Sequence, residues 1–474
     1  MARASRPDNR RPRARWPGPG LNRPPRRADR LGVRGCAPTA PGRVDAAAVL
    51  AVAMGALIAL VALGGFEPAG ASGSPRVDAG RALSLADAAR DAGDLEEADR
   101  LYRQAWDDPR TRARAADALR GLERAGRSLP IDEPAVAQTA AILGAGFARF
   151  ESDHFVVLSD AARGAVRAKI RALERTYDQF FRAMDRLGVA AAPPTHRLLC
   201  VLFQEHAMYR AFAAAHDGVD AGWVAGYYAG LSNRAVFYED ATGPAFADAH
   251  ESLRRAEADL DDARAAADRA RRDRDTETDR RVRAQIHRAQ VRLAAERERL
   301  DRLAAGTSVA KTVHEAVHLL AFNTGVQSRQ HEYPFWFTEG LATAFETDDA
   351  DRAFGPGRSG STRDAIVASN AQHGADLPLR VLVSRASAPD ATAEQTEAAY
   401  AQAWSLFEFL HRTERAALAG FVGDVLAEPP GRMTDDRRLA LFEARFGDAE
   451  RVERRWRRSL EAQRGRLAGA PGSP

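Results

Sequence analysis

The chain has 474 residues, 45% of them hydrophobic and 28% charged, a composition typical of a folded protein with more than one structural unit. Residues 1–44 contain twelve Arg and two Asp, a net charge of +10, so the rest of the chain carries 4 − 10 = −6. This acidic remainder argues against a nucleic-acid-binding surface on the folded part, and the only two cysteines, Cys36 and Cys200, exclude a disulfide framework.

An uncharged apolar segment at residues 46–66 is long enough to cross a bilayer as a helix. The positive-inside rule places the Arg-rich residues 1–45 in the cytoplasm, where we expect a disordered tail, and everything after residue 70 outside. We therefore expect a single-pass membrane anchor. The small residues at 69–71 leave cleavage as a signal segment, with a secreted product, as the alternative.

A Gly-, Ala- and Ser-rich linker is expected at residues 67–80, and a helical spacer at 81–126. Ala98, Tyr102 and Ala105 share one helix face after a turn at Gly93, and this pattern resembles one tetratricopeptide unit.

Residues 150–244 have the alternating texture of an α/β unit, with β-branched and aromatic runs separated by a long amphipathic pattern. The expected elements are a strand near 150–160, a helix at 161–187, a buried strand at 197–203, a short helix near 208–214, and two strands around a turn at Ser232-Asn233.

Residues 245–305 are rich in Ala, Arg, Asp and Glu and lack Pro. Leu253, Leu260 and Ala267 are spaced by seven, as are Ile286, Leu293 and Leu300, which predicts an antiparallel coiled-coil hairpin inserted into the chain. Its position leaves three roles open: a lid, a docking arm for a protein partner, or a neutral insertion. Residues 308–458 are expected to be mainly helical, with a last helix at 439–458 and a frayed tail at 459–474.

The motif that carries chemistry is His314-Glu315-Ala316-Val317-His318, an HExxH sequence. In a helix, residues four apart lie on one face, so both imidazoles can point at one metal ion. Zinc accepts imidazole nitrogen in a tetrahedral shell, and Glu315 between the two ligands is placed to act as general base towards a water molecule.

A catalytic zinc ion has three protein ligands and one open position. Glu339 follows His318 by 21 residues in the sequence Trp-Phe-Thr-Glu-Gly-Leu-Ala, and Pro334 is placed to begin its helix. Glu339 is therefore the predicted third ligand, on a second helix that packs against the first. Gly340 is expected to let the two helices approach closely.

An HExxH motif followed about twenty residues later by W-x-x-E-G-x-A resembles the gluzincins, the thermolysin-like clan of metallopeptidases. The fuller string HEAVHLLAFNTG…PFWFTEGLATAFE is similar to a bacterial family of unknown function, DUF1570. The resemblance covers roughly residues 150–450. It implies an α+β, zincin-like domain with a small sheet, a zinc helix and a mainly helical C-terminal lobe.

The same resemblance implies roles for further residues. Tyr400 matches a Tyr that donates a hydrogen bond to the oxyanion in aminopeptidase-type gluzincins, although it could equally be a core residue. The strand that pairs with substrate in the clan corresponds by order to residues 234–239. Thr343 stands where the clan has an Asp that orients a zinc-bound His, and Glu346 is the nearest acidic replacement.

The sequence thus predicts a zinc-dependent metallopeptidase that acts on peptide or protein substrates outside the cytoplasm. The alternative is a catalytically inactive scaffold of the same fold that works through its helical repeat and coiled-coil arm. The intact His-Glu-His-Glu set favours the enzyme, because a scaffold has no need for Glu315.

Overall fold

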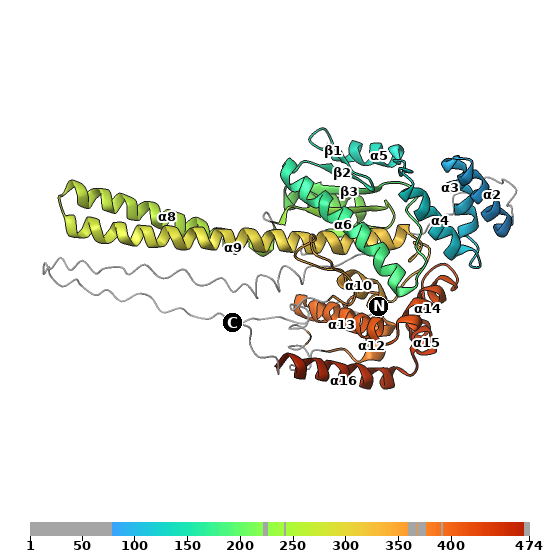
Figure 1. Ribbon diagram of the computed structural model, residues 1–474. Helices are drawn as coiled ribbons and strands as arrows, with labels where there is room; N and C mark the ends of the chain where they lie inside the picture. Colours follow the sequence, from blue (N-terminus) through green and yellow to red (C-terminus); the bar gives the residue numbers. More distant parts are fainter. Residues whose placement is uncertain are drawn as a thin grey trace, which may run out of the picture. The chain divides into compact units, whose positions relative to one another are not determined.

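The computed structural model describes residues 78–220, 226–240, 243–358, 376–389 and 392–468, together with Val367. The expected tail, the apolar segment 46–66 and nearly all of the linker lie outside these ranges. Among the helices of the described ranges, none combines the length and the apolar character that crossing a bilayer requires. The described chain is a mixed α+β protein with one small sheet (Figure 1).

Three short helices open the described chain: α2 (Ala79–Asp91), α3 (Leu95–Trp106) and α4 (Arg112–Arg124). Asp78 and Asp94 cap α2 and α3 by accepting a hydrogen bond from a backbone N–H of the first turn. The three helices bury small residues and Tyr102 against one another, and α4 supplies Leu119 and Leu122 to that core. The third helix covers the apolar face that a single helical pair would leave in water.

The sheet contains β1 (Ala148–Glu151), β2 (Phe155–Ser159), β3 (Leu198–Phe203), β4 (Gly226–Ala229) and β5 (Arg234–Tyr238), in the spatial order β1-β2-β3-β5-β4. β2, β3 and β5 are parallel, while β1 and β4 pair antiparallel at the two edges. The single strand expected near 150–160 is therefore two strands, because the chain reverses after Glu151.

Helices cover both faces of the sheet (Figure 1). α6 (Arg163–Leu187) and the C-terminal part of α9 bury one face, with alternate strand residues such as Val157, Cys200 and Phe237. α5 (Glu133–Leu143) and α7 (His206–Phe212), which ends in a π-helical turn at Ala213–Asp217, pack against the other face. The strands are buried on both sides, which explains their continuous apolar runs.

The region from 245 to 305 forms two helices, α8 (Pro244–Arg272) and α9 (Thr276–Asn323), which pack against each other (Figure 1). The sequence predicts a hairpin insertion that ends at residue 305 and a separate helical part from residue 308. Instead α9 is one helix of 48 residues, and its C-terminal third carries the HExxH motif. Gly306 does not interrupt it.

Two buried lysines fix α9 to the end of the sheet, and they are the only lysines in the chain. Lys311 forms an ion pair with Asp240, the second residue after the end of β5. Both side chains are almost fully buried. Lys169 of α6 donates a hydrogen bond of 2.6 Å to the hydroxyl of Ser308. These contacts hold α9 where it leaves the hairpin and enters the core.

The C-terminal part is helical: α10 (Phe335–Thr343), α12 (Leu379–Ser384), α13 (Ala393–Thr413), α14 (Arg415–Leu426), α15 (Asp435–Phe446) and α16 (Ala449–Ala468). The single last helix expected at 439–458 is divided at Gly447, whose φ of 90° no continuing helix allows. The helix after this break, α16, extends to Ala468. The prediction of a frayed tail from residue 459 is therefore wrong for residues 459–468, which are helical. Trp336 of α10 lies fully buried among Phe421, Phe442 and Phe446.

Candidate metal centre

The structure brings His314, His318 and Glu339 together as a buried triad that could hold a metal ion. The two histidines lie one turn apart on α9, and Glu339 comes from the middle of α10. Nε2 of His314 lies 3.1 Å from Nε2 of His318 and 3.2 Å from Oε2 of Glu339, and the third edge of this triangle is 3.5 Å.

These distances fit a tetrahedral ion of the size of zinc. Bonds of about 2.0–2.1 Å at tetrahedral angles separate neighbouring ligand atoms by about 3.3 Å. The three measured edges bracket that value. Nε2 of His314 and Nε2 of His318 face each other at 3.1 Å, and two lone pairs at this distance need a cation or a proton between them. The chemistry of the two nitrogens and the distances therefore both fit a bound cation.

Glu346 holds the other nitrogen of the first ligand. Its Oε1 lies 2.9 Å from Nδ1 of His314, and both side chains are buried. If Nδ1 carries the proton, Nε2 presents its lone pair to the centre of the triad, as in other histidine sites where a carboxylate fixes the tautomer. Thr343, three residues before Glu346, has a buried hydroxyl without a hydrogen-bond partner among the described residues.

Glu346, which the sequence offered as the nearest acidic replacement, reaches His314 because α10 ends at Thr343. Residues 344–346 form a turn, and this turn carries Glu346 back to His314. Gly340 acts differently from the expectation. A Cβ there would lie 2.7 Å from the carbonyl oxygen of Ala403, so the missing side chain allows α10 to contact α13 rather than α9.

Glu315 is completely buried beside the triad, and neither of its carboxylate oxygens has a hydrogen-bond partner among the described residues. Gly226, at the start of β4, lies directly against it, since a Cβ there would be 3.1 Å from Cγ of Glu315. Burial raises the pKa of Glu315 above its ordinary value, although the neighbouring His314 and His318 oppose this effect.

The carboxylates make the centre a site for positive charge. Burial alone would lower the pKa of His314, but the hydrogen bonds to Glu339 and Glu346 raise it to about 10. Burial tends to raise the pKa of Glu339, and the two histidines lower it below the ordinary value. The triad therefore stabilises either a proton or a metal cation at its centre.

Tyr400 of α13 is buried near the triad. Its ring centroid is 6.4 Å from that of His314, and it makes an edge-to-face contact with Phe335 at 5.2 Å. Tyr400 thus lies beside the candidate centre. This position agrees with a hydrogen-bonding role and equally with a packing role. His331, which lies between the two motifs in the sequence, points elsewhere, with Nε2 2.9 Å from the carbonyl oxygen of Glu428.

Sequence comparison gives one result for this part of the chain. Residues 308–431 match a family described as "Protein of unknown function (DUF1570)". The matched segment contains the HExxH helix, α10 with Glu339, and Tyr400. No curated protein and no solved structure gives a match to the chain.

Proposed function

We propose that this chain is a zinc-dependent metallopeptidase of the gluzincin type, with zinc on His314, His318 and Glu339 and with Glu315 as the general base. The observation that carries the proposal is the buried, unpartnered carboxylate of Glu315 next to a donor triangle of tetrahedral dimensions. Leaving such a group without a hydrogen bond costs free energy, and sites that retain one are commonly catalytic.

A zinc ion at the triad would polarise a peptide carbonyl and lower the pKa of a water molecule. In this mechanism Glu315 accepts the proton of the attacking water and later delivers it to the leaving amine nitrogen. Tyr400 donates a hydrogen bond to the oxyanion of the tetrahedral intermediate. Glu346 keeps His314 in the tautomer that presents Nε2.

The prediction that residues 234–239 pair with the substrate is wrong, because β5 is paired on both sides, with β3 and β4. The strand at this edge of the sheet is β4, which among the described strands pairs only with β5. Its first residue, Gly226, lies against Glu315. We therefore assign the extended substrate backbone to the outer edge of β4, where main-chain hydrogen bonds can form next to the base.

The proposed location is outside the cytoplasm, with residues 46–66 as a membrane anchor or, alternatively, as a cleaved signal segment. The charge pattern of the sequence supports this proposal, and the segment itself lies outside the described residues.

Two substitutions test the function. Purified protein should contain about one zinc per chain by elemental analysis, Glu315→Gln should keep the zinc and lose hydrolysis of a broad peptide library, and His314→Ala should lose both. Glu298→Gln, at an exposed position of the same helix, is the control and should leave both unchanged. Hydrolysis retained by Glu315→Gln would reject the base, and zinc without hydrolysis in the wild type would favour the inactive scaffold.

A further inference from the structure

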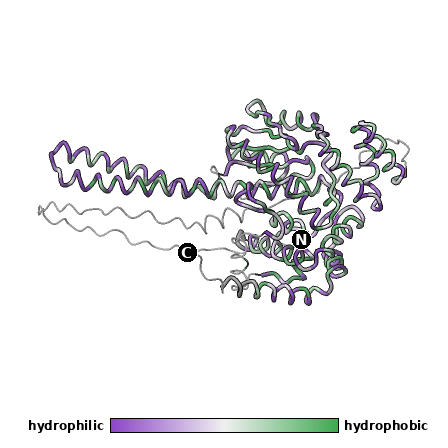
Figure 2. Tube along the Cα trace, viewed as in Figure 1, coloured by the Kyte–Doolittle hydropathy of each residue, from purple (hydrophilic) through white to green (hydrophobic). Residues whose placement is uncertain are grey.

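A stripe of alternating charge follows the outer surface of α8. Asp248, Arg255, Asp262 and Arg269 are spaced by seven residues, so they lie along one face of the helix, and all four are exposed. The opposite side of α8 is buried in the hairpin through another heptad series: Ala249 with Leu253, Leu260 and Ala267. Figure 2 shows hydrophilic residues along the length of both hairpin helices.

The stripe is not used by the hairpin itself. Within the described chain, the side chains of Asp248, Asp262 and Arg269 take part in no ion pair or hydrogen bond, and Arg255 makes only a local pair with Glu251 while staying 74% exposed. Other charged residues form ion pairs between α8 and α9. One example is the contact of 2.6 Å between Glu257 of α8 and Arg297 of α9. The stripe therefore presents unneutralised charge of both signs to solvent.

The order of signs is complementary to itself when reversed. If two α8 helices lie antiparallel with residue 248 opposite residue 269, then residue 255 lies opposite 262, and each of the four contacts joins an Asp to an Arg. A shift of seven residues in either direction places Arg255 or Asp262 opposite its own copy, and a parallel alignment in register places every charge opposite itself. A parallel alignment shifted by seven residues joins opposite charges at only three positions and leaves one stripe charge of each copy unpaired. The antiparallel register therefore forms the most Asp–Arg contacts.

The neighbouring positions fit the same alignment. It places Ser252 opposite Ala265, Glu251 opposite Ala266, and Ala258 opposite Asp259, so the like charges that come near each other are the two copies of Asp259 at the centre of the alignment. The small side chains among these residues allow two helices to come close. A partner of a single charge sign would meet as much repulsion as attraction along this stripe, whereas a second copy places an opposite charge at all four stripe positions.

We propose that two copies of this chain associate through α8, antiparallel, about a two-fold axis between residues 258 and 259. Such an interface is isologous, because the same surface is used by both subunits. Exposed ion pairs are weak and are screened by salt, so the association is strongest at low ionic strength and weakens as salt is added.

A charge-exchange experiment on the full-length chain tests the alignment. Asp248→Arg with Asp262→Arg makes the stripe entirely basic, and Arg255→Asp with Arg269→Asp makes it entirely acidic. At low salt, each double variant should self-associate at least about tenfold more weakly than wild type in sedimentation, and an equimolar mixture should recover a dimer. Exchanging Asp261 and Arg264, which pair with each other away from the stripe, is the control and should change nothing.

A disulfide experiment tests the register. In the proposed dimer the two copies of residue 258 are offset by about 1.5 Å along the helix axes, and the two copies of residue 265 by about 20 Å. Under mild oxidation Ala258→Cys should cross-link to itself and Ala265→Cys should not, since a disulfide requires Cα atoms within about 7 Å. Both variants keep the native Cys36 and Cys200, so the comparison isolates the new thiol.

Three results would overturn the proposal: a wild-type chain that stays monomeric at low salt, charge variants that do not recover a dimer when mixed, or equal cross-linking at residues 258 and 265.

Discussion

The bond between Glu346 and His314 makes the sharpest test of the metal centre. Among the described residues, Glu346 supplies the one carboxylate within hydrogen-bond distance of Nδ1 of His314, and Glu346→Ala removes it. Both groups are buried and the contact is 2.9 Å, so water cannot simply replace the lost acceptor. Loss of such a supporting carboxylate weakens metal binding by about 10- to 100-fold, equivalent to about 1.4–2.7 kcal/mol.

The assay is a zinc titration in competition with a chromophoric chelator, with circular dichroism to show that each variant is folded. Glu346→Gln, which keeps an acceptor but loses the charge, should fall between wild type and the Ala variant. Thr343→Ala is the matched control, because its hydroxyl makes no hydrogen bond in the described structure, and its zinc affinity should stay within about twofold of wild type. Equal losses in Thr343→Ala and Glu346→Ala, or no loss in either, would refute the assignment of Glu346.

Further predictions concern the framework around the site. Lys311→Ala leaves Asp240 buried without its partner and should lower the free energy of unfolding by about 3–5 kcal/mol in urea titrations, with Asp240→Asn in addition restoring part of it. Gly340→Ala forces α10 away from α13 and should cost about 1–3 kcal/mol in the same assay, with weaker zinc binding. Burial opposes protonation of His154, but two neighbouring glutamates raise its pKa to about 9. Because that pKa is raised from 6.5 on folding, the stabilisation of up to about 3 kcal/mol is present below pH 6.5 and is lost as the pH rises through 9; a His154→Gln variant should lack this slope between pH 6.5 and 9.

The triad could be predicted from the sequence because its geometry is mostly local. The spacing of His314 and His318 fixes two donors on one helix face, and the short connection to a Pro-initiated helix limits where Glu339 can lie. The heptad spacing of the hairpin is likewise a local signal, since each helix repeats its apolar positions every seven residues.

Features that depend on tertiary packing could not be predicted in the same way. Gly306, Thr307 and Ser308 are poor helix formers at the end of the predicted insertion, yet α9 runs through them because Thr307 is buried and Ser308 is held by Lys169. Strand order is also not given by chain order. The two strands of the β4–β5 hairpin can each take the outer place, and only the pairing of β3 with β5 puts β4 at the edge.

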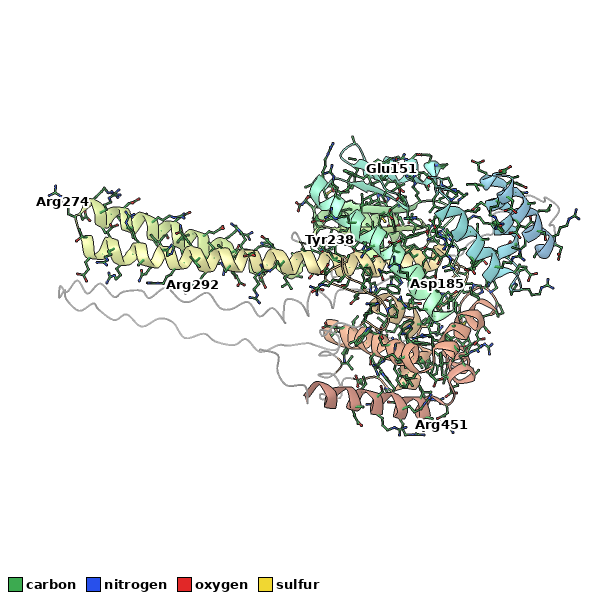
Figure 3. The ribbon with its side chains drawn as sticks, viewed as in Figure 1. Glu151, Asp185, Tyr238, Arg274, Arg292 and Arg451 are labelled. Atoms are coloured by element: carbon green, nitrogen blue, oxygen red, sulfur yellow. The ribbon has the colours of Figure 1, made fainter. Side chains whose placement is uncertain are left out.

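The continuity of α9 gives the hairpin a fixed relation to the metal centre. The exposed Arg292, which is labelled in Figure 3, belongs to the same uninterrupted helix as the candidate ligand His314. At about 1.5 Å per residue the two lie about 33 Å apart along the helix axis. As a whole α9 contacts α8, α6, α10 and the strands β4 and β5, and its residues 310–322 are buried throughout, so the helix is firmly packed at the end that carries the candidate ligands. A flexible insertion would be joined to the core by loops on both sides. Here one of the two connections is the helix of the candidate metal centre itself, so anything that fixes the direction of the hairpin also fixes the orientation of α9.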